Sequence, residues 1–286
     1  MGNRIFLVDA FTDNPFAGNP AAVCFLSGPA EDVWMQNIAR EMNVSETAFL
    51  YPGGGGFHLR WFSPELEVDL CGHATLASAH ILWEESVLNR KNTGRFFTKS
   101  GILTAELSDN WIYLNFPIDE TREQVSKSET GIIEEALKVE PLYLAKTRYD
   151  FLVEVETEEI LKGLNPKMEL LKRLPGRGTV VTSRATAKSY DFVSRFFGPK
   201  CGINEDPVTG SSHCALTPYW GGKLKKKEMI AYQASLRGGM LRVKTEGDRV
   251  ILGGQAVTVF HGELCGREPL ITDSGSMSNP KRLILH

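Results

Sequence analysis

Two short segments of small and apolar residues constrain the fold of this chain more than any other part of its sequence. The first is DLCGHATLASAHIL, residues 69–82, and the second is EDPVTGSSHCAL, residues 205–216. The residues that follow Gly72 and Gly210 are small or apolar on every side of the expected helix, which is typical of a helix buried on all faces. Two buried helices of this kind predict two similar structural units.

Runs of β-branched and aromatic residues surround both segments and predict strands. In the first half these runs are RIFLVDAF, PAAVCFL, ETAFLY, FHLRWFS, FFTKSG, ILTAEL and WIYLNFP. In the second half they are RYDFLVEV, GTVVTS, YDFVSRFFG and a meander from AYQASLR to the run DRVILGGQAVTVFHGEL. The glycines at 53–56 predict a hairpin loop, and Asp32 is the expected N-cap of a helix in DVWMQNIAREMN. Many short strands and few helices predict an α+β fold rather than a doubly wound parallel sheet.

A polar stretch from about Asp119 to Thr130 divides these two halves. We interpret it as a linker, which gives an N-terminal domain over residues 1–118 and a C-terminal domain over residues 119–286. The last strand is a candidate to cross back and complete the first domain. The tail from Thr272 to Arg282 is low in apolar content, and we expect it to be loop-like or poorly ordered.

Composition and charge narrow the classes of function. The chain has 286 residues and a net charge of −3, so no global basic field favours nucleic acid or an anionic membrane. No apolar run has the length of a signal peptide or a membrane span. The five cysteines are irregularly spaced, which indicates free thiols in a reducing compartment and predicts a cytoplasmic protein. No metal-ligand spacing is present, so we expect neither a metal nor a cofactor.

The starts of the two buried helices predict a site for a small anion. The first amides of a helix have no partner within the helix and carry partial positive charge, and a glycine leaves them open to a ligand. Aligning Gly72 with Gly210 places Cys71 opposite Thr209 and His73 opposite Ser211. Two facing helix starts of this kind would bind a substrate carboxylate. The alternative is two ordinary helices, capped by Asp69 and Thr209.

Glu46 is the candidate general base. It lies in MNVSETAFL, between Val44 and the apolar run Ala48-Phe49-Leu50. A carboxylate near apolar walls has a raised pKa, which suits it to accept and return a proton near neutral pH. The alternative is a solvated glutamate in a turn. His73 and Asp206 add polar groups at the helix starts, although a buried structural histidine and a helix cap would also explain them.

Four motifs in order along the chain resemble the PhzF-like family of phenazine biosynthesis. They are DAFTDNPFAGNPAAV, AREMNVSETAFL, LRWFSPELEVDLCGHATLASA and EDPVTGSSH, and the likeness continues through RGG and GGQAVTV near the end. The resemblance implies the diaminopimelate epimerase fold, with two pseudo-symmetric domains. In this fold each domain is a mostly antiparallel sheet wrapped round a central helix, and the active site lies in the cleft between them.

The family also implies roles for individual residues. Glu46 would move a proton on a carbon skeleton, and His73 and Asp206 would be further site residues. The substrate would be bound by residues at the helix starts, which are Cys71, Gly72, Thr209, Gly210 and Ser211. Diaminopimelate epimerase uses two cysteines at the corresponding positions, but here the second position is Thr209, which favours one base over two.

The sequence therefore predicts a cofactor-independent isomerase that acts on a small carboxylate-bearing substrate through Glu46. Two alternatives remain open. One is a two-base epimerase or racemase that uses Cys71, and the other is a non-catalytic binding protein that keeps the fold. No nucleic acid or membrane partner is expected, and a homodimer is the candidate assembly.

Overall fold

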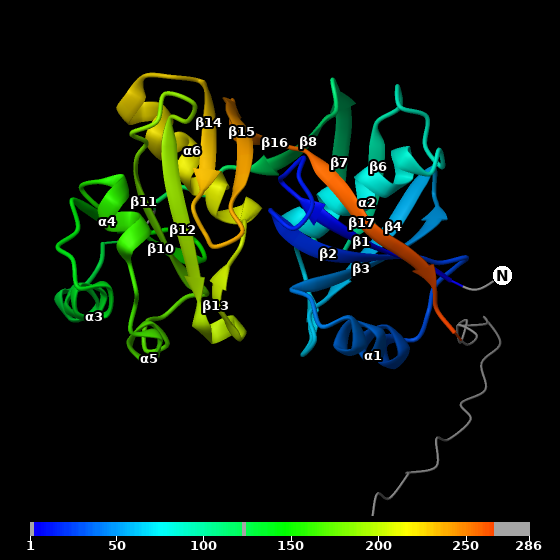
Figure 1. Cartoon of the computed structure of the whole chain (residues 1–286), viewed down its shortest axis with the longest axis horizontal. Coiled ribbons are helices and arrows are strands. Elements are labelled where there is room, and N and C mark those ends of the chain that lie inside the picture. Colours follow the sequence, from blue (N-terminus) through cyan, green and yellow to red (C-terminus); the bar gives the residue numbers. More distant parts are fainter. Residues whose placement is uncertain (1–2, 122–123, 266–286) are drawn as a thin grey trace, which may run out of the picture.

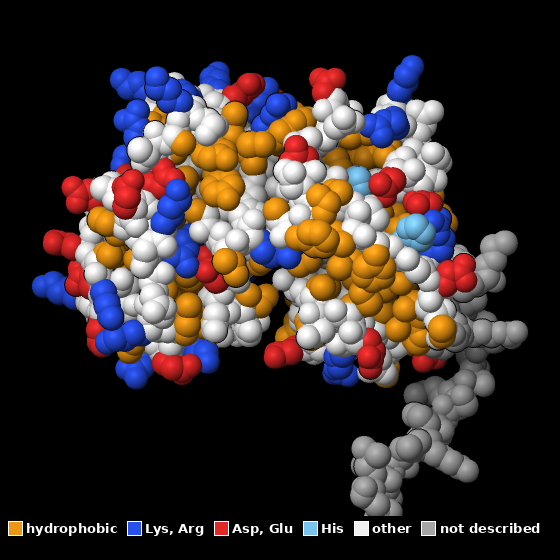
Figure 2. Space-filling model, viewed as in Figure 1, with side chains coloured by type: hydrophobic (Ala, Val, Ile, Leu, Met, Phe, Trp, Pro, Cys, Tyr) orange, Lys and Arg blue, Asp and Glu red, His pale blue; other side chains and the backbone are white. Residues whose placement is uncertain are grey.

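A computed structural model describes residues 3–121 and 124–265, and the tail segment 272–282 lies outside these ranges. The chain forms two lobes that lie side by side, each with a helix enclosed by strands (Figure 1). In the space-filling view a notch separates the lobes at the lower edge (Figure 2). No helix in the described ranges has the length and apolar character needed to cross a membrane.

The N-terminal lobe is a strongly curved sheet around the helix α2 (Gly72–Glu84). Its strands pair in the order β17 (Ala256–Glu263), β1 (Arg4–Ala10), β2 (Asn19–Phe25), β3 (Glu46–Gly53), β4 (Gly56–Phe62), β6 (Gly94–Thr98), β7 (Gly101–Ser108) and β8 (Trp111–Pro117). The short strand β5 (Glu67–Val68) pairs with β4. The helix α1 (Asp32–Met42) packs outside, against β3 and β4.

The C-terminal lobe repeats this plan around the helix α6 (Gly210–Leu224). Its strands pair in the order β16 (Arg249–Gly254), β15 (Gly239–Glu246), β14 (Glu228–Gln233), β12 (Phe192–Gly198), β11 (Gly178–Arg184), β10 (Asp150–Glu154) and β9 (Tyr143–Lys146). The strand β13 (Ile203–Asp206) pairs with β12. The remaining helical elements are α3 (Lys127–Leu137), α4 (Glu158–Gly163), α5 (Met168–Leu171) and the 3₁₀ turn η1 (Pro199–Cys201).

The direction of strand pairing shows that the two lobes are copies of one plan. The pairs β2–β3 and β4–β6 are parallel, and so are their counterparts β10–β11 and β12–β14. The other pairs within each lobe are antiparallel. In each lobe the enclosed helix follows the short strand, β5 or β13, along the chain. Strands β8 and β16 then pair with each other, which joins the two sheets at their matching last strands.

Both central helices are buried, as their composition predicts. In α2 the residues from His73 to Ala79 are all buried, because small side chains let β1, β2, β3, β8 and β17 approach the helix closely. In α6 the buried run extends from Ser212 to Thr217 and rests on β14, β15 and β16. The glycine hairpin between β3 and β4 is also confirmed.

Three local predictions were wrong. The polar stretch ending at Thr130 is not all linker, because α3 begins at Lys127 and is capped by a reciprocal pair of hydrogen bonds between Ser126 and Glu129. The last predicted meander strand is two strands, since β16 pairs with β15 in the C-terminal lobe while β17 pairs with β1, as expected for a last strand that crosses back to the first domain. The N-cap of α1 is Glu31, and Asp32 is already the first helical residue.

Candidate active site

The first residues of α2 and α6 meet between the lobes. A Cβ atom placed on Gly72 would lie 3.7 Å from the Cα of Gly210, and one placed on Gly210 would lie 3.7 Å from the Cα of Gly72. The two helix starts therefore face each other in direct contact, as their doubled sequence pattern suggests. Such a close approach is natural for two residues without side chains.

Backbone amides at both helix starts are open to a ligand. Within the described ranges, no acceptor is bound by the amides of Gly72, His73, Gly210 or Ser211. Cys71 and Thr209 occupy the two N-cap positions, and neither side chain caps its helix. The alternative of two ordinary helices capped by Asp69 and Thr209 is therefore not what the structure shows. The positive ends of two helix dipoles point at one place, which is favourable for an anion.

Glu46 and His73 bring a carboxylate and an imidazole together beside these helix starts. Glu46 is the first residue of β3, and its side chain is 16% exposed. Its Oε2 lies 3.3 Å from Nε2 of His73, whose side chain is 7% exposed. The two atoms are not aligned as a hydrogen bond, and Nε2 has no hydrogen-bond partner among the described residues. A buried polar atom without a partner is rare, so Nε2 is a group that a ligand would satisfy.

Asp206 enters the same site from the end of β13. Its Oδ1 accepts a hydrogen bond of 2.8 Å from Nδ2 of Asn19, and its Oδ2 accepts one from the hydroxyl of Thr209. Gln233 fixes this corner, since its side chain accepts from the Thr209 amide and donates to the Asp206 carbonyl. The sequence motif around Asp206 therefore folds into a hydrogen-bonded loop that leads directly into α6.

Burial sets the protonation of the ionisable groups. Loss of water raises the pKa of Glu46 to about 7, and the negative charge of Asp206 adds to that effect. The same loss of water raises the pKa of Asp206 to about 6 and lowers the pKa of His73 to about 3. His73 is therefore neutral at physiological pH, while Glu46 exchanges its proton readily there.

Cys71 lies beside this group but is poorly suited to act as a base. Its Sγ is 3.5 Å from Nδ1 of His73, and the thiol also contacts the carboxylate of Glu46. Burial and then the charge of Glu46 raise the pKa of Cys71 well above its ordinary value. The thiolate is the reactive form of cysteine, and it is strongly disfavoured here.

The side chains of Glu46, Cys71 and His73 are also the one group of potential metal ligands found in the described ranges, with one donor atom of each within 4.8 Å of the others. The imidazole is badly placed for this role. Its Nδ1 faces the amino group of Asn19, so the ring proton belongs on Nε2, which is the nitrogen that faces Glu46. A ring with its proton directed at the shared space offers no lone pair to an ion there.

Three residues near the site escaped the sequence analysis. Asn19 is fully buried and binds Asp206, and Gln233 is fully buried and binds Thr209. Arg177 pairs with Asp150, and its positive charge lowers the pKa of both Glu46 and Asp206. Asn19 stood in DAFTDNPFAGNPAAV, one of the motifs that carried the family resemblance, and that motif was the only signal for it.

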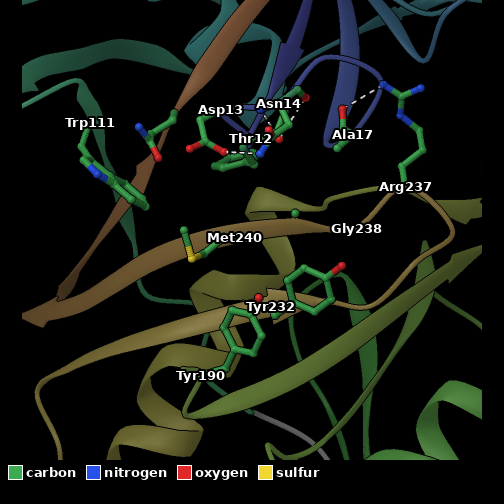
Figure 3. A pocket seen from close by; sticks show the side chains of 13 residues that line it. Thr12, Asp13, Asn14, Ala17, Trp111, Tyr190, Tyr232, Arg237, Gly238 and Met240 are labelled. Atoms are coloured by element: carbon green, nitrogen blue, oxygen red, sulfur yellow. Dashed lines mark hydrogen bonds between the residues drawn. The ribbon is translucent and has the colours of Figure 1, made fainter. Parts of the chain in front are cut away.

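A cavity of about 230 Å³ lies elsewhere between the lobes and has no predicted site residue in its wall (Figure 3). Its wall includes Trp111, the stacked rings of Tyr190 and Tyr232, and Met240. Arg237 borders it but is engaged with the carbonyl of Ala17. The ionisable groups with strongly shifted pKa values are all outside this cavity, so we place the candidate site at the helix starts.

Comparison with known proteins agrees with this architecture. A family model described as phenazine biosynthesis-like protein (PhzC–PhzF) matches residues 8–262. An uncharacterized isomerase of Halalkalibacterium halodurans is 54% identical over 265 residues, which cover 92% of this chain and 99% of that protein. The crystal structure of a PhzF-family phenazine biosynthesis protein from Enterococcus faecalis is 41% identical to this chain and has a TM-score of 0.85. The match covers 92% of this chain and 99% of that protein.

A more distantly related structure has only its fold in common with this chain. A hydroxyproline epimerase from Agrobacterium vitis, solved with bound trans-4-hydroxy-L-proline, is 11% identical with a TM-score of 0.60 over 92% of each chain. The predicted α+β, epimerase-like fold is thereby confirmed. Since the family model and the close relatives extend over nearly all of the sequence, the chain belongs to the phenazine biosynthesis-like (PhzC–PhzF) family.

Proposed function

We propose that this protein is a cofactor-independent isomerase that moves a proton on a small carboxylate-bearing substrate, with Glu46 as the single acid/base group. The observation that carries the proposal is the pairing of Glu46, whose pKa is raised to about 7, with the unpartnered Nε2 of His73 3.3 Å away. The names of relatives that are 44–54% identical, each an uncharacterized isomerase, support the same class of reaction.

The substrate carboxylate would bind the open amides at Gly72–His73 and Gly210–Ser211, where two helix dipoles favour negative charge. Ionised Glu46 then removes a proton from carbon, and the electron pair spreads into the adjacent unsaturated or carbonyl group. The ring N–H at Nε2 of His73 and the hydroxyl of Ser211 stabilise that charge as it develops. Protonated Glu46 returns the proton to another carbon, which shifts the double bond. Asp206 orients a polar group of the substrate.

One base fits this site better than two. A two-base epimerase needs a second base on the opposite face of the carbon atom. Cys71 has a strongly raised pKa. Thr209, at the matching position, donates a hydrogen bond from its hydroxyl to the carboxylate of Asp206. Neither is an effective base near neutral pH. In our proposal both residues form the wall of the pocket.

The reaction can be tested without knowing the natural substrate. We would incubate the protein in D₂O with a panel of small cyclic and unsaturated amino and hydroxy acids, and follow carbon-bound protons and double-bond position by ¹H NMR. Wild-type protein should exchange or shift a proton in at least one acid. Glu46→Gln should be slower by about 10²–10⁴-fold, because it lacks the base. Cys71→Ser should keep most of the activity.

The alternatives give different results in this experiment. An inactive Cys71→Ser together with inversion at carbon would establish the two-base epimerase. Binding of an acid by calorimetry, without exchange in any of them, would favour the non-catalytic binding protein. A fully active Glu46→Gln would refute the role of Glu46.

A further inference from the structure

We infer that Asn19 is a positioning residue that holds the His73 ring in the tautomer protonated on Nε2, and so aims an N–H donor at the atoms around Glu46. Asn19 has no role in the sequence prediction, and it acts from the side of His73 opposite Glu46. The inference deepens the proposed function and rests on it for its effect on rate, but the tautomer itself is measurable without a substrate.

The backbone before Asn19 is rigidly held. Gly18 has a φ of +64°, and a Cβ atom there would lie 2.2 Å from the carbonyl oxygen of Ala10, so this turn requires glycine. Arg237 from the other lobe donates to the carbonyl of Ala17 (Figure 3). It also donates to the carbonyl of Gly18 and to the carboxylate of Asp9. The amide of Gly18 donates to the carbonyl of Gly238 at 2.7 Å. The first residue of β2 is thus fixed by contacts from both lobes.

The orientation of the Asn19 side chain follows from its neighbours. Its Nδ2 lies 2.8 Å from Oδ1 of Asp206 and 2.9 Å from the carbonyl oxygen of Val208, which are both acceptors. A flipped amide would place oxygen against both of them, so the amino group must face this way. The same amino group lies 3.3 Å from Nδ1 of His73.

This contact selects the histidine tautomer. A proton on Nδ1 would point at the amide nitrogen of Asn19, which is a donor group and cannot accept a hydrogen bond, so Nδ1 must be the bare nitrogen and Nε2 must carry the proton. The other close neighbour of Nδ1 is the sulfur of Cys71 at 3.5 Å, which is a weak donor and a weak acceptor and selects neither form. Nε2 is buried, 3.3 Å from Glu46, and has no other partner in the described ranges.

Without Asn19 the opposite tautomer becomes available. Nδ1 could then carry the proton toward Cys71, and Nε2 would become an acceptor for protonated Glu46. In that form the site has lost the donor that stabilises charge on the substrate. Loss of one preorganised donor of this type costs about 10²–10³-fold in kcat. The effect should appear in kcat rather than in KM, because Asn19 acts through His73.

The test is ¹⁵N NMR of the ring nitrogens of His73 in wild type and Asn19→Ala. In wild type Nε2 should give the signal of a protonated nitrogen and Nδ1 that of a bare nitrogen. In Asn19→Ala the two signals should move toward each other or exchange. Gln233→Ala is the matched control, because Gln233 is an equally buried amide that binds Thr209 and Asp206 but does not touch His73. Asn19→Ser removes the same amino group and replaces Asn19→Ala if that variant does not fold.

Each outcome decides the matter. A shift of the His73 signals in an Asn19 variant but not in Gln233→Ala supports the inference. Unchanged His73 signals in a folded Asn19 variant overturn it. Unchanged signals with a lower exchange rate would mean that Asn19 contacts the substrate directly, which also overturns it. If wild type exchanges no acid in the panel, the proposed function fails, while the NMR result still decides the role of Asn19.

Discussion

The carboxyl groups of Glu46 and Asp206 enter one site from different lobes, and the negative charge of Asp206 helps to hold the pKa of Glu46 at about 7. Glu46 begins β3 of the N-terminal lobe, whereas Asp206 ends β13 of the C-terminal lobe. The protonation of the candidate base therefore depends on how the two lobes meet. This dependence is directly measurable in variants.

Asp206→Asn should lower the pKa of Glu46, because it removes a negative charge near that carboxylate. Desolvation would remain as the larger cause, so the pKa should stay above 4.5. The measurement is a ¹³C NMR titration of the Glu46 side-chain carboxyl. Glu205→Gln is the control, since the adjacent Glu205 is paired with Arg195. Equal titration curves in wild type and Asp206→Asn would contradict the coupling.

Glu46→Gln should stabilise the protein at alkaline pH. The pKa of Glu46 is raised from 4.5 to about 7, so between these values the folded state binds more protons than the unfolded state. The free energy of unfolding of wild type must therefore fall as pH rises through this window. At pH 8 the variant should be more stable by about 3 kcal/mol, and at pH 4 the difference should vanish. Urea unfolding at several pH values measures this.

Glu67→Gln gives the opposite sign and is the control for that experiment. Hydrogen bonds from Arg60 lower the pKa of Glu67, so its ionised form stabilises the fold above the unfolded pKa. Its removal should destabilise the protein at neutral pH, and the loss should shrink as the pH falls through the lowered pKa. Parallel pH profiles for the two variants would contradict our assignment of Glu46.

Gly18→Ala and Gly210→Ala should differ sharply in stability. At Gly18 the added Cβ would lie 2.2 Å from a backbone oxygen at a positive φ, so we expect a loss of more than about 2 kcal/mol. At Gly210 the atom nearest to the added Cβ would be 3.5 Å away, which is an ordinary van der Waals contact. The free energy of unfolding should therefore change by no more than about 1 kcal/mol. Thermal unfolding distinguishes them. Similar losses of stability in both variants would mean that the helix starts pack more tightly than the 3.5 Å contact at Gly210 implies.

Crystals soaked in sulfate or a dicarboxylate should show an anion at the helix starts. We expect its oxygens within hydrogen-bond distance of amides in Gly72–His73 or Gly210–Ser211, since these amides have no acceptor of their own in the described ranges. An anion bound only at surface lysines would remove the main support for the carboxylate subsite.

The sequence predicted the parts of the fold that have a local pattern. The all-round apolar helices after Gly72 and Gly210 and most of the strands follow from the residue pattern of single segments. The helix α3 escaped prediction because its first turn is polar and its capping residue, Ser126, stands in the apparent linker. The pairing of β8 with β16 and of β1 with β17 joins segments far apart in the sequence, and no local pattern specifies such pairs.

The site was predictable to the extent that its residues stand in recognisable motifs. Glu46, His73 and Asp206 do so, and the structure places them around the same helix starts. Their catalytic roles remain predictions. Asn19 and Gln233 owe their importance to partners that are distant in the sequence, so only the folded chain brings them together.

The pairing of β17 with β1 has a consequence for how the protein is made. Strand β1 is synthesised long before its partner β17, so the N-terminal lobe lacks one strand until β17 has been made. During that time the outer edge of β1 is an exposed strand edge, and such edges recruit other chains. We therefore expect this lobe to be the aggregation-prone part of the nascent chain and the part that most needs a chaperone.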